Sequence, residues 1–165
     1  MNREEWLEER KKGIGGSDVA CILGMSPYKS NVELWEEKVG IREAEDISQK
    51  EYVKNGTDSE DPLRKLFAID YKQYEKWKDG NIPQNYYLQT LQYFLADEDM
   101  DFGYLRAYLI RHQADGTATR EIRDYVIANN RIEVQDDLNY LKPKEIEFWS
   151  YVENKIRPAL ILPEI

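Results

Sequence analysis

The sequence has few of the residues that build several common kinds of functional site. Among its 165 residues there is one cysteine, Cys21, and one histidine, His112. This scarcity excludes an internal disulfide, a zinc site made of cysteine and histidine side chains, and a catalytic group that uses two histidines. No apolar run approaches the roughly 18 residues that a membrane-spanning helix needs, so we expect no membrane partner.

Basic residues are also in deficit. The chain has 23 lysine and arginine residues against 32 aspartate and glutamate residues, a formal net charge of -9. Such a charge opposes non-specific binding to nucleic acid, which depends on neutralising phosphates with basic side chains. Residues 1–6 lack the apolar segment of a secretion signal, so the sequence predicts a cytoplasmic protein.

Apolar and aromatic residues are sufficient for one folded core. Apolar residues make up 41% of the sequence, which includes twelve tyrosines and four tryptophans. A length of 165 residues is that of one domain, so we predict a single domain over residues 1–165. Residues 41–57 are polar and have no apolar periodicity, and they are predicted to form a mobile connector.

Two segments in the second half of the chain alternate with the period of a β-strand. Apolar residues occupy alternate positions in residues 102–111 and again in residues 120–128. Asp115-Gly116 between them is a turn signal, which predicts an antiparallel hairpin. About five helices are expected to pack around this small sheet, so the predicted fold class is α+β.

Capping residues and prolines mark the expected helix boundaries. Ser30 and Glu33 have the spacing of a capping box, and Ser17 or Asp18 is placed to cap a short helix after a glycine-rich turn. Pro143 is expected to begin the last helix. The apolar stripe of that helix is predicted at Ile146, Trp149, Val152 and Ile156.

A series of motifs runs along nearly the whole chain: Arg10, the segment 13–20, Leu23-Gly24-Met25-Ser26-Pro27-Tyr28, Glu33-Leu34-Trp35, Glu60-Asp61-Pro62, Trp77, Tyr86-Tyr87-Leu88-Gln89 and Phe148-Trp149. In this order they resemble the YqaJ-type viral recombinases, relatives of the phage lambda exonuclease. The resemblance implies a protein encoded by a phage or prophage, acting in the host cytoplasm. It also implies a reduced version of the restriction-endonuclease-like core, the PD-(D/E)xK nuclease fold.

The segment that carries catalysis in this family has no counterpart in the chain. Family members are metal-dependent 5′-to-3′ exonucleases in which an aspartate and a Glu-x-Lys on a strand pair hold Mg²⁺. Those strands lie between segments that resemble residues 66–72 and 74–77, and here almost nothing separates the two. The resemblance therefore implies a non-catalytic, cofactor-free derivative that acts by binding. The alternative is an Mg²⁺-dependent nuclease with an improvised site drawn from Glu60, Asp70, Lys72 and Gln89.

The retained N-terminal motif indicates an anion site. In the exonuclease relatives, an arginine and a serine at places matching Arg10 and Ser17 hold the 5′-phosphate of DNA. The glycine turn also leads into a helix N-terminus, where free N–H groups favour an anion. Asp18 and the overall acidity oppose such a site. The candidate phosphate- and DNA-binding residues are Arg10, Lys11, Lys12, Gly15, Gly16 and Ser17.

Two kinds of partner fit these features. One is a DNA end, and the other is a host defence nuclease, whose basic groove an acidic inhibitor such as an anti-CRISPR protein would occupy. A third interpretation is an oligomer that buries the sheet edge left by the lost strands. Glu36-Glu37-Lys38 matches the bare Glu-x-Lys pattern, but on a predicted helix it is expected to be a solvated face.

Overall fold

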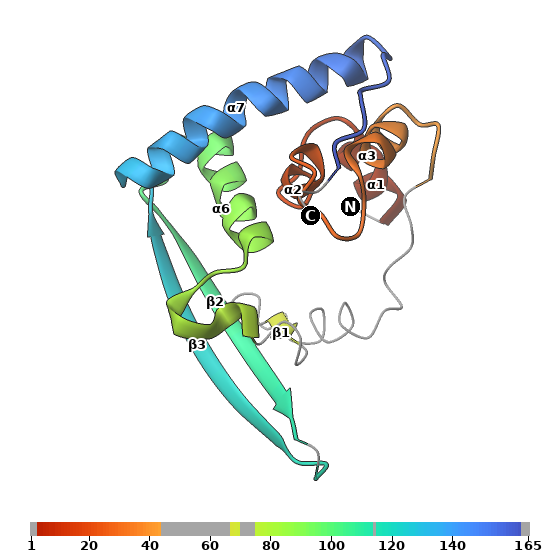
Figure 1. Ribbon diagram of the computed structural model, residues 1–165. Coiled ribbons are helices and arrows are strands. Elements are labelled where there is room, and N and C mark those ends of the chain that lie inside the picture. Colours follow the sequence, from red (N-terminus) through yellow and green to blue (C-terminus); the bar gives the residue numbers. More distant parts are fainter. Residues whose placement is uncertain (1–2, 44–66, 70–74, 114, 163–165) are drawn as a thin grey trace. The chain divides into compact units, whose positions relative to one another are not determined.

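The computed structural model describes residues 3–43, 67–69, 75–113 and 115–162 (Figure 1). The chain divides into two compact units. The first, the helical unit, comprises Met1–Ala44, Gln84–Asp101 and Ala128–Ile165. The second, the sheet unit, comprises Glu45–Pro83 and Phe102–Ile127. The single domain over residues 1–165 stays a prediction. The predicted connector at residues 41–57 lies almost wholly outside the described residues.

Five α-helices of the helical unit lie within the described residues: α1 (Arg3–Lys11), α2 (Val19–Ile22), α3 (Asn31–Lys38), α6 (Gln84–Ala96) and α7 (Ile132–Glu153) (Figure 1). The short helix α2 contacts α3, α6 and α7. Its four residues are all buried, so α2 is held by its neighbours rather than by its own length. The core cluster around it consists of Cys21, Ile22, Leu34, Trp35 and Phe148.

The start of α3 is the predicted capping box. The backbone N–H of Glu33 donates to Ser30 Oγ at 3.2 Å, and the backbone N–H of Ser30 donates to Glu33 Oε2 at 3.0 Å. The reciprocal pair satisfies two donors that the first turn of a helix leaves free. Gly40 follows the C-terminal end of α3 with a φ of +80°, a conformation that glycine adopts without strain.

Helix α7 begins earlier than the sequence predicts. It starts at Ile132, and Pro143 lies inside it rather than at its first position. Its buried face is not the predicted stripe, since Ile146 is 63% exposed. An interior proline removes one helical hydrogen bond, at a cost of about 3 kcal/mol. Burial of a continuous face outweighs this cost; that face consists of Val134, Leu138, Leu141, Glu145 and Phe148.

The C-terminal segment returns to the first helices of the same unit. Asn31, which is buried, donates from Nδ2 to the carbonyl of Ala159 at 2.7 Å. Its Oδ1 accepts from the N–H of Ile161 at 3.0 Å. Ile161 also lies so close to Gly24 that a Cβ added to this glycine would meet its side chain at 2.5 Å. One asparagine therefore ties the start of α3 to the C-terminal segment.

The sheet unit contains β1 (Phe67–Ile69), β2 (Phe102–His112), β3 (Ala118–Ala128) and the 3₁₀ helix η1 (Glu75–Gly80) (Figure 1). The sheet order is β1-β2-β3, and β1 runs parallel to β2. The β2–β3 hairpin is confirmed, and its turn is closed by the N–H of Gln113 donating to the carbonyl of Thr117 at 2.8 Å. The sequence does not predict β1, because three residues are too few to show a period.

One side of the hairpin is buried, as the alternation predicts. Ala107 and Leu109 on β2 and Ile127 on β3 are buried. Trp77 of η1 is also fully buried, with its ring 5.4 Å from that of Tyr125. The fold class is therefore α+β, as predicted. None of the described helices is long and apolar enough to cross a membrane.

Candidate functional site: the glycine turn

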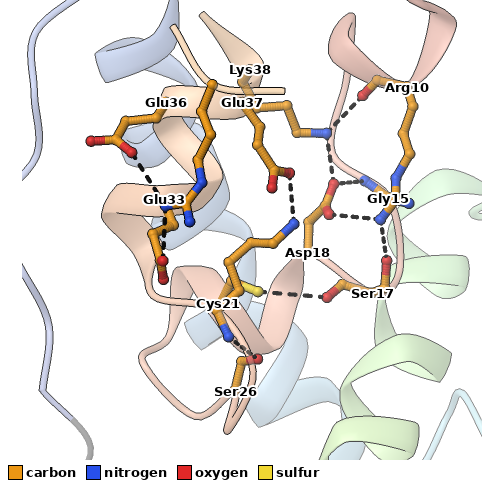
Figure 2. Close-up of polar contacts among 12 residues, drawn as sticks. Arg10, Gly15, Ser17, Asp18, Cys21, Ser26, Glu33, Glu36, Glu37 and Lys38 are labelled. Carbon is orange, nitrogen blue, oxygen red and sulfur yellow. Dashed lines mark hydrogen bonds and ion pairs between the residues drawn. The ribbon is translucent and has the colours of Figure 1, made fainter. Parts of the chain in front are cut away.

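Residues 13–18, here called the glycine turn, connect α1 to α2 and contain three of the six predicted phosphate-binding residues, Gly15, Gly16 and Ser17 (Figure 2). Two short contacts between Gly15 and Asp18 close the turn. The backbone N–H of Asp18 donates to the carbonyl of Gly15 at 2.8 Å. In return, the N–H of Gly15 donates to Asp18 Oδ2 at 2.9 Å. The backbone path of the turn therefore depends on the carboxylate of Asp18.

Asp18 does not cap α2 with its side chain, contrary to one of the two capping predictions. It stands at the N-cap position, but no side-chain capping bond forms. Its carboxylate points back toward the turn because three donors meet it there: the N–H of Gly15, Arg10 Nη2 at 3.2 Å and Lys38 Nζ at 2.7 Å (Figure 2). These cations outcompete the weaker backbone donors of a four-residue helix.

Lys38, at the end of α3, is the most consequential residue that the sequence analysis missed. The prediction of a solvated helix face is wrong for it, because only 4% of its side chain is exposed. Its ammonium group donates to the carbonyl of Arg10, the carbonyl of Gly13 and Asp18 Oδ2, each at 2.7 Å. The i, i+3 and i, i+4 spacings along α3 do not indicate that Lys38 pairs with Asp18, which is twenty residues away in sequence.

Arg10 and Ser17 meet in the structure. Arg10 Nη2 donates to Ser17 Oγ at 2.7 Å. Ser17 is exposed, and 36% of the Arg10 side chain is exposed. Two cations, Arg10 and Lys38, surround the single carboxylate of Asp18, so these three side chains carry a net charge of about +1. The carboxylate that was expected to oppose an anion is thus buried and compensated.

Lys11 and Lys12 lie beside this arrangement but are engaged with acids of their own helix. Lys11 Nζ is 2.7 Å from Glu8 Oε1, and Lys12 Nζ is 2.5 Å from Glu9 Oε1. Exposed pairs of this kind are weak and screened by salt. The two lysines therefore add local positive charge to the surface rather than fixed ligands of the turn.

Gln89 is brought to the glycine turn from α6. A Cβ added to Gly16 would come within 2.7 Å of Gln89 Cγ, so only a glycine leaves room for this contact. Gln89 Nε2 also donates to Tyr93 Oη, one helical turn further along, at 3.4 Å. The structure thus places one of the four candidate catalytic residues against the predicted phosphate-binding turn, although they are more than seventy residues apart in sequence.

A second polar pair borders the turn and was not predicted. Gln92 Nε2, on α6, donates to the carbonyl of Ile14 at 3.3 Å. Glu145, on α7, is only 8% exposed. Burial raises the pKa of Glu145 to about 7, with a hydrogen bond from Gln92 acting in the opposite direction. The only indication of Glu145 in the sequence is its position within the apolar face of α7.

Cys21 is not placed for nucleophilic chemistry. The residue is buried, and its Sγ contacts the carbonyl of Ser17 at 3.9 Å. Burial raises the pKa of the thiol above its ordinary value, so the reactive thiolate is disfavoured. The cysteine belongs to the core cluster beneath the glycine turn.

The other three candidate catalytic residues, Glu60, Asp70 and Lys72, lie outside the described residues. Within the described residues, no three histidine, cysteine or acidic side chains gather closely enough to hold a metal ion. Because α2 has only four residues, its dipole is short.

Comparison with known proteins identifies the part of the chain that contains this site. Residues 5–76 match the family model of the YqaJ-like viral recombinase domain. The chain is also similar to "Uncharacterized protein YqaJ" of Bacillus subtilis (strain 168), with 46% identity over 69 residues. That match covers 42% of this chain and 21% of the relative, so the chain spans about a fifth of the relative's length. No solved structure matches the chain. The similarity to the YqaJ-like viral recombinase domain therefore covers residues 5–76, which include the entire glycine turn and Lys38.

Proposed function

We propose that this protein binds the 5′-phosphorylated end of a DNA duplex through Arg10 and Ser17, without hydrolysing it. The observation that carries the proposal is the hydrogen bond of 2.7 Å between Arg10 Nη2 and Ser17 Oγ, at a place where both side chains reach the surface. A guanidinium beside a hydroxyl offers a phosphate a charged donor and a neutral donor at the same point.

The charge distribution supports this assignment despite the net charge of -9. A terminal phosphate needs only a local positive site, whereas binding along a duplex needs many lysines and arginines. Lys38 compensates Asp18, so Arg10 faces the surface beside a neutralised carboxylate. We therefore expect the protein to bind the end of a duplex rather than to bind along its length.

The test compares two fluorescent duplexes that differ only in a 5′-phosphate or a 5′-hydroxyl end. Binding is measured by anisotropy in EDTA, and digestion is followed by gel with and without Mg²⁺. We expect wild-type protein to prefer the phosphorylated end by tenfold or more, since a hydrogen bond to a charged group contributes about 1.5–3 kcal/mol. Arg10→Gln should abolish the preference.

Lys12→Gln is the matched control, because it removes one positive charge two residues away without touching Ser17. It should lower both affinities slightly and leave their ratio unchanged. Equal binding of both ends by wild-type protein would contradict the proposal. Digestion that requires Mg²⁺ would instead support the alternative nuclease, built around Glu60, Asp70 and Lys72.

A second candidate function, inhibition of a host defence nuclease such as a CRISPR effector, is favoured by the surface of the β2–β3 hairpin. The side opposite the buried one carries exposed apolar groups, with Phe102 59% and Tyr104 60% exposed. An acidic protein with such a surface suits a basic, partly apolar groove. Loss of nuclease inhibition in Tyr104→Ser, with Arg10→Gln unaffected, would select this function over DNA-end binding.

A further inference from the structure

Lys38 joins three separate parts of the glycine turn. Its three N–H donors reach the carbonyl of Arg10 at the end of α1 and Asp18 Oδ2 where the turn ends (Figure 2), and the carbonyl of Gly13 where the turn begins. An ammonium group has three donors and no acceptor, so this set uses its full hydrogen-bonding capacity. A lysine buried in this way is part of the fold of the turn.

The partner of Lys38 is equally enclosed. Only 3% of the Asp18 side chain is exposed, and its Oδ1 also lies 3.2 Å from Arg10 Nη2. A buried carboxylate needs a cation nearby. Without Lys38, Arg10 would be the only cation in contact with it in the described structure, and moving the guanidinium toward a phosphate would leave a buried negative charge uncompensated.

We propose that Lys38 is a positioning residue of the phosphate site: it compensates Asp18 permanently, so that Arg10 can turn its guanidinium to an incoming phosphate. The inference rests on the proposed function, because it concerns how the same site takes its ligand. Lys38 itself stays buried and makes no contact with the DNA end. Its effect passes through Asp18 and the backbone of residues 10–13.

The experiment measures the ratio of affinities for 5′-phosphate and 5′-hydroxyl duplexes in EDTA for three variants: Lys38→Met, Asp18→Asn, and the double variant with both changes. Lys38→Met should lose about tenfold of the wild-type preference, because Asp18 then holds Arg10 and opposes the phosphate. The double variant should regain most of the preference, because methionine and asparagine are both neutral and no buried charge is left without a partner.

The recovery in the double variant separates the proposed role from a purely structural one. If Lys38 served only to hold the two carbonyls, removing the charge of Asp18 would restore nothing. Circular dichroism and thermal unfolding establish that each variant is folded. If Lys38→Met alone does not fold, the double variant decides, because it removes the lysine without stranding a carboxylate.

Lys29→Met is the matched control. Lys29 also pairs with an acid on α3, Glu37, at 2.6 Å, and it lies outside the glycine turn. Its loss should leave the preference unchanged.

Two results would overturn the inference while leaving the proposed function in place: a folded Lys38→Met with the wild-type preference, or a double variant with no more preference than Lys38→Met. A wild-type protein with no preference for the phosphate would overturn the proposed function, and the inference with it.

Discussion

Asp18 and Glu145 are both buried carboxyl groups of the helical unit, and their surroundings differ sharply. Asp18 accepts from a lysine, an arginine and a backbone N–H. Glu145 has one oxygen, Oε1, that meets no donor in the described part of the chain. The pKa of Glu145 is raised to about 7, chiefly by burial and in part by the charge of Asp18. Burial by itself thus favours a neutral acid, and a carboxylate stays charged in the interior where cations are supplied.

The two groups border the same turn from different elements. Asp18 closes the glycine turn directly through Gly15, while Glu145 lies near Gln92, whose amide holds the carbonyl of Ile14. Gln92 Oε1 also meets no donor in the described part of the chain. Within the described residues, Glu145 Oε1 and Gln92 Oε1 are therefore two acceptors without a donor, and protonation of Glu145 would supply one donor. The turn therefore has a charged contact through Asp18 and a titratable contact through Glu145.

The largest effect on stability is expected from removing Asp18, the charged partner of Lys38. Asp18→Ala leaves the ammonium of Lys38 buried without its carboxylate, so we expect a loss of about 3–5 kcal/mol in the free energy of unfolding. Urea denaturation followed by circular dichroism measures it. Asp124→Ala, at an exposed aspartate of β3, is the control and should change stability far less. A loss below about 1 kcal/mol in Asp18→Ala would show that the pair is not what stabilises the turn.

The next effect is the pH dependence contributed by Glu145. Because the pKa is raised from 4.5 to about 7 on folding, its contribution to stability is fully present below pH 4.5 and is lost as the pH rises through about 7. The loss amounts to about 3 kcal/mol by pH 8. Glu145→Gln should abolish this slope. Urea denaturation of both proteins between about pH 4 and 8.5 measures the difference, and parallel curves would contradict the assignment.

A smaller effect is expected from Gln92. Its hydrogen bond lowers the pKa of Glu145, against the larger effect of burial. Gln92→Leu should therefore raise the pKa of Glu145 further and move the midpoint of the pH-dependent loss above 7. Carbon-13 NMR of the Glu145 carboxyl group follows the titration. A midpoint that moves downward or stays in place would show that Gln92 does not favour the ionised form.

The smallest effect is expected for an ion pair outside the helical unit. Arg106 Nε and Nη2 contact the two carboxylate oxygens of Asp124 across the hairpin, at 2.6 and 2.8 Å. More than a third of each side chain is exposed. Water and salt screen such a pair, so its coupling in a double-mutant cycle should be several-fold smaller than that of Lys38 and Asp18, and should vanish in high salt. Equal couplings would remove the distinction between buried and exposed pairs.

Local signals in the sequence were sufficient for several features. The alternation in residues 102–111 and 120–128, with Asp115-Gly116 between them, predicts the hairpin that the structure contains. The spacing of Ser30 and Glu33 predicts the capping box. Each of these depends on residues close in sequence and on backbone geometry alone. The motif at Arg10 and residues 13–20 was likewise sufficient to indicate the family that matches residues 5–76.

The start of α7 shows where local signals fail. Pro143 predicts a helix start because its ring suits the first helical position, yet the helix already begins at Ile132. Contacts of Leu138 and Leu141 with the rest of the helical unit decide the matter, and both are buried. A proline signal is worth a few kcal/mol, and a continuous buried face exceeds it.

The sequence by itself determined the fold class, the hairpin, the start of α3 and the position of the glycine turn, because each follows from residues within a few positions of one another. The tertiary structure alone decided that Lys38 is buried against Asp18, that Gln89 meets Gly16, and that Glu145 lies beside Gln92. Each of these pairs joins different elements. The charge state of a side chain depends on burial and on the partners that folding brings to it, so the electrostatics of the candidate site became defined only in the folded protein.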